Sequence, residues 1–202
     1  MVSSSRTKPK LPFETATLPV KTTARASRAK PTPLSSTAKS TGANAGVYVT
    51  DNATCTIRDC VVENTKEEAI VVTQNAECSI LSNTILRECK GPGVDCSNNA
   101  RCLLSSSQIT KNVGGIWAWD SSSVTCVKSL IDGGHSHALV FDGHSSPTFS
   151  DSVVVGVVHA SEKSWKGIRG PNVTITKTER MTQWPSEDGA FKFSPNPYTR
   201  KQ

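Results

Sequence analysis

A fivefold internal repeat constrains what this chain can fold into. Each copy opens with a small residue followed by an apolar one, and the openings are Gly46, Ala69, Gly93, Gly115 and Ala138. These openings are 23, 24, 22 and 23 residues apart. Self-similarity at a nearly fixed period is typical of stacked units that bury their apolar faces only against one another.

Within each copy, apolar residues recur at every second position, as in Val47 and Val49 or Cys55 and Ile57. A spacing of two predicts strands with one buried face rather than helices. Each copy holds three such short segments, and polar turn residues such as Asp51 and Asn52 separate them. This pattern predicts an all-β parallel β-helix of about five coils. A leucine-rich repeat shares the period, but the chain lacks its leucine columns and its helix-forming half.

Equivalent positions in the copies form columns that we expect to stack. The column nine residues into each copy is Cys55, Cys78, Cys102, Val124 and Pro147. The column eleven residues in is Ile57, Ile80, Leu104, Cys126 and Phe149. The column sixteen residues in is Val62, Ile85, Ile109, Ile131 and Val154. A polar column lies fourteen residues in and comprises Cys60, Asn83, Ser107, Ser129 and Ser152.

The repeat unit, with Gly-Val/Ile-x-Val at its start, then Asn-Ala-x-Cys-x-Ile and Asn/Ser-x-Ile, resembles the right-handed parallel β-helix repeat. That repeat occurs in pectate lyases and polygalacturonases, in the substrate-recognition region of certain F-box proteins, and in several cytoskeletal proteins. The resemblance covers residues 45–160 or so. It implies the fold but not the function, because the family includes enzymes, adhesins and pure scaffolds.

The repeat divides the chain into three parts. Residues 1–44 are expected to form a basic, extended arm rich in Pro, Ser and Thr; residues 45–176 the β-helix with its cap; and residues 177–202 an extended tail rich in Pro and aromatic residues. Ser161–Lys166 looks like an insertion, and Val173–Thr176 could belong to a truncated sixth coil. Open coil ends are exposed sheet edges, so we expect this segment and Thr41–Ala45 to act partly as caps.

The arm concentrates the positive charge of the chain. Its eight basic residues stand against Glu14 alone, which gives +7, whereas the whole chain carries +6 and the remainder is therefore −1. This imbalance predicts an acidic partner surface, with tubulin, nucleic acid or anionic lipid as candidates. Prolines within the arm disfavour the alternative of a mitochondrial presequence. The candidate partner-binding residues are Arg6, Lys8, Lys10, Lys21, Arg25, Arg28, Lys30 and Lys39.

The cysteines and the hydropathy pattern bear on location. No apolar run approaches the ~20 residues that span a bilayer, so we expect no membrane association. The seven cysteines are odd in number and mostly lie at inward positions of the repeat. We therefore expect free thiols that pack as small hydrophobes in a reducing, intracellular compartment. Without a CxxC pair a structural zinc site is not expected, and we predict no cofactor.

One face of the predicted solenoid is unusually apolar. The outward positions of the first strand include Tyr48, Val71, Trp117, Trp119 and Val140. Such a stripe on a surface that should be polar indicates an interaction site. We expect the stripe to be covered by the chain itself or by a partner protein rather than to stack on sugar rings.

The same face offers little for catalysis. Asp95 and Asp142 are its only outward carboxylates, and they are expected two coils apart, with Asp120 at a neighbouring turn. Sugar hydrolysis needs two carboxylates at a set separation, and lyase chemistry needs a basic residue that this face lacks. We therefore predict that the protein is not an enzyme. The four histidines, which are most simply turn residues and are not expected to form a metal site, are His135, His137, His144 and His159.

The tail contributes a last set of candidates. Its aromatic residues lie between prolines and could anchor an extended peptide or fold back on the last coil; they are Trp184, Phe191, Phe193 and Tyr198. Together these features predict a monomeric, non-catalytic β-helix within a large intracellular hetero-complex, with a cytoskeletal lattice such as the ciliary axoneme favoured. A carbohydrate-binding or polysaccharide-degrading protein is the first alternative. A subunit of a mitochondrial ribonucleoprotein complex is the second.

Overall fold

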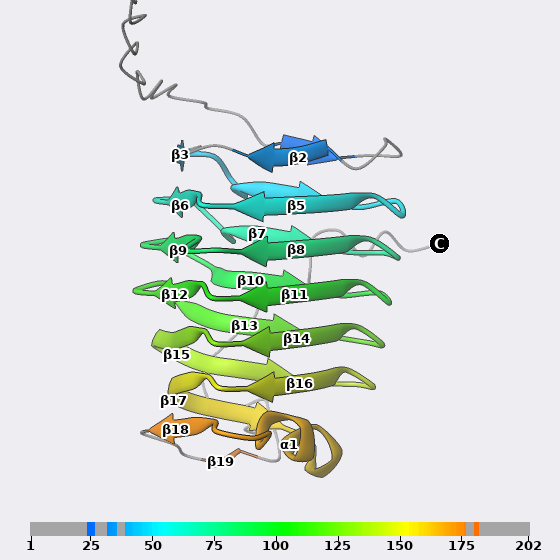
Figure 1. Cartoon of the computed structure of the whole chain (residues 1–202), viewed down its shortest axis with the longest axis vertical. Helices are drawn as coiled ribbons and strands as arrows, with labels where there is room; N and C mark the ends of the chain where they lie inside the picture. Colours follow the sequence, from blue (N-terminus) through cyan, green and yellow to red (C-terminus); the bar gives the residue numbers. More distant parts are fainter. Residues whose placement is uncertain (1–23, 27–31, 36–38, 177–179, 182–202) are drawn as a thin grey trace, which may run out of the picture.

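The computed structural model describes residues 24–26, 32–35, 39–176 and 180–181, and shows a stack of about six β-solenoid turns (Figure 1). Every strand pairs in parallel with its equivalent in the neighbouring coil, as the repeat predicts. The strands form one 13-stranded and one six-stranded sheet.

Three columns of strands run along the stack. The first column is β1 (Ala24–Ala26), β4 (Val47–Val49), β7 (Ile70–Val72), β10 (Pro92–Cys96), β13 (Gly114–Ala118) and β19 (Arg180–Met181). The second is β2 (Thr32–Ser35), β5 (Thr54–Arg58), β8 (Glu77–Leu81), β11 (Arg101–Ser105), β14 (Ser123–Val127) and β16 (Ser146–Ser150). The third is β3 (Lys39–Thr41), β6 (Val61–Glu63), β9 (Ile85–Arg87), β12 (Gln108–Thr110) and β18 (Thr174–Thr176).

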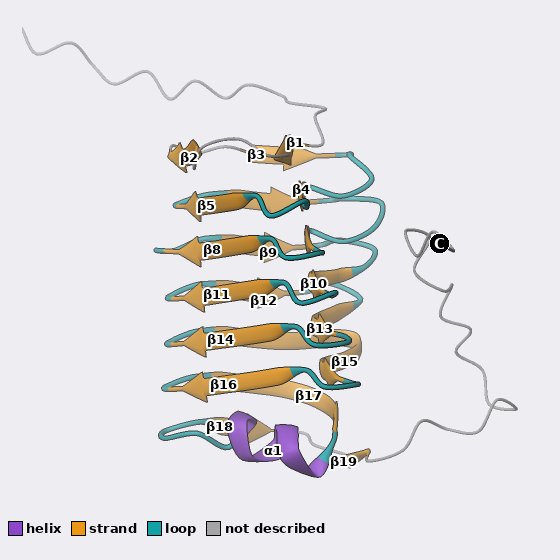
Figure 2. Cartoon of the chain, turned by 90° about the vertical axis from the view of Figure 1, so that its right-hand side faces the viewer, coloured by secondary structure: helices purple, strands orange, loops and turns teal. Residues whose placement is uncertain are grey.

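Two long strands join the first column to the third. β15 (Leu130–Phe141) pairs with β12 through its first residues and with β13 through its last. β17 (Val153–Ala160) lies against β15 along both parts. The first and third columns therefore belong to one sheet, whereas the second column forms the six-stranded sheet (Figure 2).

The interior consists of columns of like residues. The column eleven residues into each copy is in register from coil to coil and at most 1 % exposed, and it comprises Ile57, Ile80, Leu104, Cys126 and Phe149. Cys55, Cys78 and Cys102 stack in the neighbouring column. All seven cysteines are buried and free. Their burial removes apolar surface from water, which is the main favourable term in such a stack.

The second copy departs from the predicted columns by one residue. Leu86, not Ile85, pairs with Val62 and Ile109, and Leu86 is fully buried. The cause is the preceding turn, where both Ser82 and Asn83 adopt positive φ angles of 48° and 58°. The equivalent turns of the other coils contain fewer residues with positive φ angles. The extra residue in this turn therefore shifts the register of the strand that follows.

The polar column closes the same turn in successive coils. The Ser107, Ser129 and Ser152 hydroxyls each donate to the carbonyl oxygen two residues earlier, at 2.7–2.9 Å. The Ser129 hydroxyl also accepts from the Ser107 backbone N–H, and the Ser152 hydroxyl accepts from that of Ser129. In the second copy the shifted Thr84 takes this place and donates to the Leu81 carbonyl oxygen. Buried backbone groups at the turns are thereby satisfied.

The solenoid begins earlier than the predicted boundary at residue 45. β1, β2 and β3 pair in parallel with β4, β5 and β6, and so add a coil within the segment predicted as an extended arm. Pro33 lies in β2, at the edge of the six-stranded sheet. Proline is tolerated on edge strands because an N–H group facing outward is not needed for pairing. The small and proline-rich composition hid this coil from the apolar pattern.

A helix covers the other end of the stack. The segment predicted as an insertion forms α1 (Glu162–Ile168), whose N-terminal N–H group at Ser164 is capped by the Ser161 hydroxyl. The Ser164 hydroxyl donates to the Ser145 carbonyl oxygen, and Ile168 is fully buried. β18 then pairs with β17, as predicted for a truncated coil. The helix thus packs against the last strand of the six-stranded sheet, where the next coil would otherwise lie.

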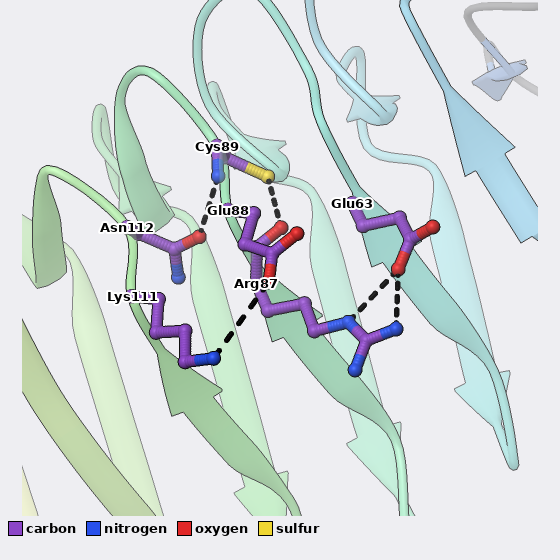
Figure 3. A network of polar contacts seen from close by, with 6 residues as sticks. All are labelled: Glu63, Arg87, Glu88, Cys89, Lys111 and Asn112. Carbon is purple, nitrogen blue, oxygen red and sulfur yellow. Dashed lines mark hydrogen bonds and ion pairs between the residues drawn. The ribbon is translucent and has the colours of Figure 1, made fainter.

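A polar network stabilises the turn between the third and first columns (Figure 3). Arg87 binds the buried Glu63 carboxylate through Nε at 2.8 Å and Nη2 at 2.7 Å. One coil on, the fully buried Asn112 side chain accepts from the Cys89 backbone N–H at 2.9 Å and donates to the Leu86 carbonyl oxygen at 3.0 Å. Asn112 therefore satisfies two backbone groups of the preceding coil.

We expect Asn112→Leu to lower the free energy of unfolding by about 2–4 kcal/mol, because each orphaned buried backbone group costs about 1–3 kcal/mol. Chemical denaturation monitored by far-UV circular dichroism measures this loss. Thr110→Val, a change at a partly exposed strand position beside it, is the matched control and should stay within about 0.5 kcal/mol of the parent. Equal stability of the two variants would contradict the bridging role of Asn112.

Candidate functional site

The outward positions of the first column form one continuous row, which we call the outer row. Its members are register partners from coil to coil: Tyr48, Val71, Asp95, Trp117, Val140 and His159. Alternation along each strand places their neighbours, such as Val47 and Val49, in the interior. Tyr48, Val71, Trp117 and Val140 of the predicted face thus lie in one line. Trp119 lies beyond the end of β13.

Most of the outer row is buried although it points away from the solenoid interior, and only Tyr48 and Asp95 are partly exposed. Val140 is fully buried, Val71 is 6 % exposed and Trp117 is 8 % exposed. These three side chains are therefore already covered within this chain and do not form an open platform.

Two tryptophans form the centre of this face. The rings of Trp117 and Trp119 meet edge to face, with centroids 6.4 Å apart and planes at 83°. The Trp117 indole N–H donates to the His137 carbonyl oxygen at 3.4 Å. Gly114 leaves room for this ring, because a Cβ there would lie 2.6–2.8 Å from three of its atoms. The backbone of β13 and the bulged strand β15 thereby fix the orientation of Trp117.

A partly exposed aspartate with one buried carboxyl oxygen lies between Val71 and Trp117. Asp95 Oδ1 is buried and has no hydrogen-bond partner. Burial, with the nearby Glu68 as the next cause, raises the pKa of Asp95 to about 7; a hydrogen bond with the Trp119 side chain partly opposes this, and Asp120 adds to it. Both acidic neighbours disfavour the charged form, and burial disfavours it most.

Glu68 is the second carboxyl of this site. It lies in the turn immediately before β7, and its Oε2 atom is buried without a hydrogen-bond partner. Burial raises the pKa of Glu68, with a smaller contribution from Glu67. Glu68 is absent from the predicted site residues because it precedes the repeat copy rather than occupying one of its outward positions. The one sequence feature that could have identified Glu68 is its position directly before Ala69, which opens a repeat copy.

The histidines lie farther along the first column. The rings of His137 and His159 meet edge to face at 6.4 Å. Burial lowers the pKa of both imidazoles, and the nearby Asp142 opposes this at His159. The pairing of β15 with β17 shifts register on either side of His137, so this part of the first column is irregular.

Several predicted residues lie elsewhere. Arg25 and Lys39 of the predicted arm are in β1 and β3. The other arm residues lie outside the described residues, and these are Arg6, Lys8, Lys10, Lys21, Arg28 and Lys30. All four tail anchors also lie outside them, namely Trp184, Phe191, Phe193 and Tyr198.

The His, Cys, Asp and Glu side chains of the described residues form no group of three or more that could hold a metal ion. Among the same residues, no helix combines the length and apolar character needed to cross a membrane.

Parallel coils, in-register interior columns and a separate outer row define a β-solenoid protein with a candidate contact face. Residues 40–177 match the family described as the right handed beta helix region. The chain belongs to this family, which confirms the resemblance inferred from the repeat. Comparisons with curated proteins and with solved structures gave no match.

Proposed function

We propose that this protein is a non-catalytic structural component of a large intracellular assembly, and that Tyr48 and Trp119 belong to a docking surface for another protein. The observation that carries the proposal is that these two aromatic side chains stay partly exposed, beside a row of residues that is otherwise mostly buried. Aromatic residues in such positions are typical anchors of protein interfaces. A rigid parallel stack also suits a spacer, because each coil is held by its neighbours.

A cytoskeletal lattice, in particular the ciliary axoneme, is the assembly that we favour. Residues 1–44 carry a net charge of +7, and the surface of tubulin is acidic. The charge of such a segment acts mainly through steering and weak, salt-sensitive attraction. The partly exposed Tyr48 and Trp119 would then provide specific contacts that long-range attraction cannot supply.

The test is retention of the tagged full chain in detergent-extracted ciliated cells. We expect the protein to stay with the tubulin-containing insoluble fraction at low salt and to leave it as the salt concentration rises. Trp119→Ser should reduce retention several-fold, because a docking surface loses an aromatic anchor. The matched control is Val153→Ser, which alters a side chain that is 40 % exposed on the third column.

Two outcomes would contradict the proposal. Free extraction of the parent protein at every salt concentration would contradict the assembly proposal. Equal loss of retention in both variants would contradict the role of Trp119 in docking. A further variant lacking residues 1–23 keeps β1, β2 and β3 in place, and it should be released at lower salt than the parent.

A carbohydrate-binding or polysaccharide-degrading function is the second candidate. The observation that favours it is the pair of carboxyls, Asp95 and Glu68, beside Trp117 and Trp119, because a carboxyl with a raised pKa suits a general acid. The two candidates differ in turnover. Release of reducing ends from soluble polysaccharides by the parent and not by Asp95→Asn would support the enzyme and reject the non-catalytic scaffold.

A further inference from the structure

An open hollow lies on the surface at the bend that joins the second column of strands to the third (Figure 1). Its volume is about 380 Å³, and its lining includes Ser106, Gln108, Lys128, Leu130, Asp151 and Val153. Val153 is 40 % exposed, the highest value among the large apolar side chains of the described residues. Gln108, Lys128 and Asp151 are exposed as well, and Leu130 is partly exposed. Unlike most of the outer row, this surface is accessible to a partner.

Two ladders of residues run along this bend. The corner ladder consists of residues with positive φ angles of 52°, 50°, 49° and 55°, which are Ser106, Lys128, Asp151 and Asn172. The strand ladder consists of the residues two positions later, which are register partners from coil to coil: Gln108, Leu130, Val153 and Thr174. Neighbouring parallel strands lie about 4.8 Å apart. Each ladder therefore presents one side chain at every step of about this size.

The order of residues along the ladders is self-complementary about a point between two coils. The coil on one side of this point carries Lys128 and Leu130, and the coil on the other side carries Asp151 and Val153. A two-fold axis through this point places Lys128 of each copy opposite Asp151 of the other copy. The same axis places Leu130 opposite Val153, so that apolar side chains meet. Such reciprocity is what an isologous interface requires.

The flanking coils obey the same relation. The two-fold axis places Ser106 opposite Asn172 and Gln108 opposite Thr174, and all four side chains are exposed. Hydroxyl and amide groups both donate and accept hydrogen bonds, so each of these pairs can form one. Charged, apolar and polar positions of the ladders thus all meet groups that suit them.

The two charged residues fix the register and have capacity for a partner. None of the ion pairs among the described residues includes Lys128 or Asp151. Asp151 accepts a hydrogen bond from the Asn172 side chain at 2.8 Å, and a carboxylate has further acceptor sites. Moving the two-fold axis by half a coil brings Lys128 against Lys128, or Asp151 against Asp151. Repulsion between like charges therefore selects one register of the two copies.

We propose that the hollow and its two ladders form the interface of a two-fold symmetric dimer of this chain, in which two solenoids lie side by side and point in opposite directions. Contact between Leu130 and Val153 removes apolar surface from water, and the charge pairs supply specificity. The dimer goes beyond the proposed docking function and uses a different face from Tyr48 and Trp119. It departs from the single copy expected from the sequence, which was inferred without this surface.

The experiment is sedimentation equilibrium of the purified full-length protein over a range of concentrations at low salt. We expect the parent protein to show twice the mass of one chain. Lys128→Glu and Asp151→Lys should each weaken self-association by at least about tenfold, because each change turns both attractive pairs of the dimer into repulsive ones. Thermal melting of each variant verifies that it is folded.

An equimolar mixture of the two variants gives the decisive result. In a mixed dimer the introduced glutamate faces the introduced lysine, and the unchanged Asp151 of one copy faces the unchanged Lys128 of the other. The mixture should therefore recover the dimer that neither variant forms alone. Asp59→Lys is the matched control: Asp59 is an exposed corner residue with a φ angle of 53°, but it lies outside the hollow. This variant should dimerise like the parent.

Three results would overturn the inference. They are a parent protein that stays monomeric up to about 0.1 mM, a dimer that persists in both single variants, and a mixture that remains monomeric. The proposed function is tested separately, by retention in extracted cells. Loss of the dimer leaves Tyr48 and Trp119 in place on each copy, so either proposal can fail without the other.

Discussion

Replacing Ile80 by aspartate is expected to unfold the entire solenoid rather than one coil. Ile80 is fully buried and lies in register between Ile57 and Leu104. A carboxylate at this position has no partner, and the cost of burying it is at least several kcal/mol. This is a large part of the roughly 5–15 kcal/mol that stabilises a typical domain. Because each coil is stabilised by the coils next to it, the damage should spread along the stack.

The measurement is far-UV circular dichroism during heating, with the change at the adjacent residue as the control. Ser79 lies on the same strand, is in register with Thr56 and Leu103, and is partly exposed. Ser79→Asp should therefore alter the free energy of unfolding by no more than about 1 kcal/mol. Similar melting curves for Ile80→Asp and Ser79→Asp would show that the interior column is out of register.

The repeat predicted the fold because every copy contributes the same class of residue to the interior of the solenoid. In-register strands require the same residue class at the same position, so Ile57, Ile80 and Leu104 could be aligned from spacing alone. The prediction failed where backbone conformation, not side-chain type, set the register. Two consecutive positive φ angles at Ser82 and Asn83 moved Leu86 into the column predicted for Ile85.

The ends of the stack were harder to predict for a different reason. A terminal coil packs against a neighbouring coil on one side only, so it needs fewer large apolar residues. β2 could accordingly include Pro33, and its pairing with β5 left no apolar periodicity to detect. α1 was missed because its seven residues include only two large apolar side chains, Trp165 and Ile168, which is too short a pattern for a helical period.

The sequence predicted which residues share the outward row of the candidate site, but it did not predict the raised pKa of the carboxyl group there. Strand alternation placed Tyr48, Val71, Trp117 and Val140 on one outward row. Alternation cannot give the depth at which a side chain is buried, so the sequence did not reveal the raised pKa of Asp95. That property depends on contacts between coils, including a turn residue that the repeat does not align.

The last prediction concerns the pH dependence of stability that this carboxyl creates. The pKa of Asp95 is raised from 3.8 to about 7, chiefly by burial. The folded state thus holds a proton that the unfolded state has already lost, and the stability that Asp95 contributes is present below about pH 4 and disappears as the pH rises through 7. At about pH 8 the folded protein bears a penalty of up to about 4 kcal/mol, since one pKa unit corresponds to about 1.4 kcal/mol.

Asp95→Asn removes the titrating group while keeping its size. We expect this variant to match the parent protein at about pH 4 and to be more stable by about 2–4 kcal/mol at about pH 8. Urea unfolding at a series of pH values measures the difference, and contributions from Glu68, His137 and His159 largely cancel because both proteins contain them. Glu77→Gln should run parallel to the parent across the series. If Asp95→Asn does the same, Asp95 is ionised in the folded protein across this range, and its buried oxygen is satisfied by a group that already neutralises the charge.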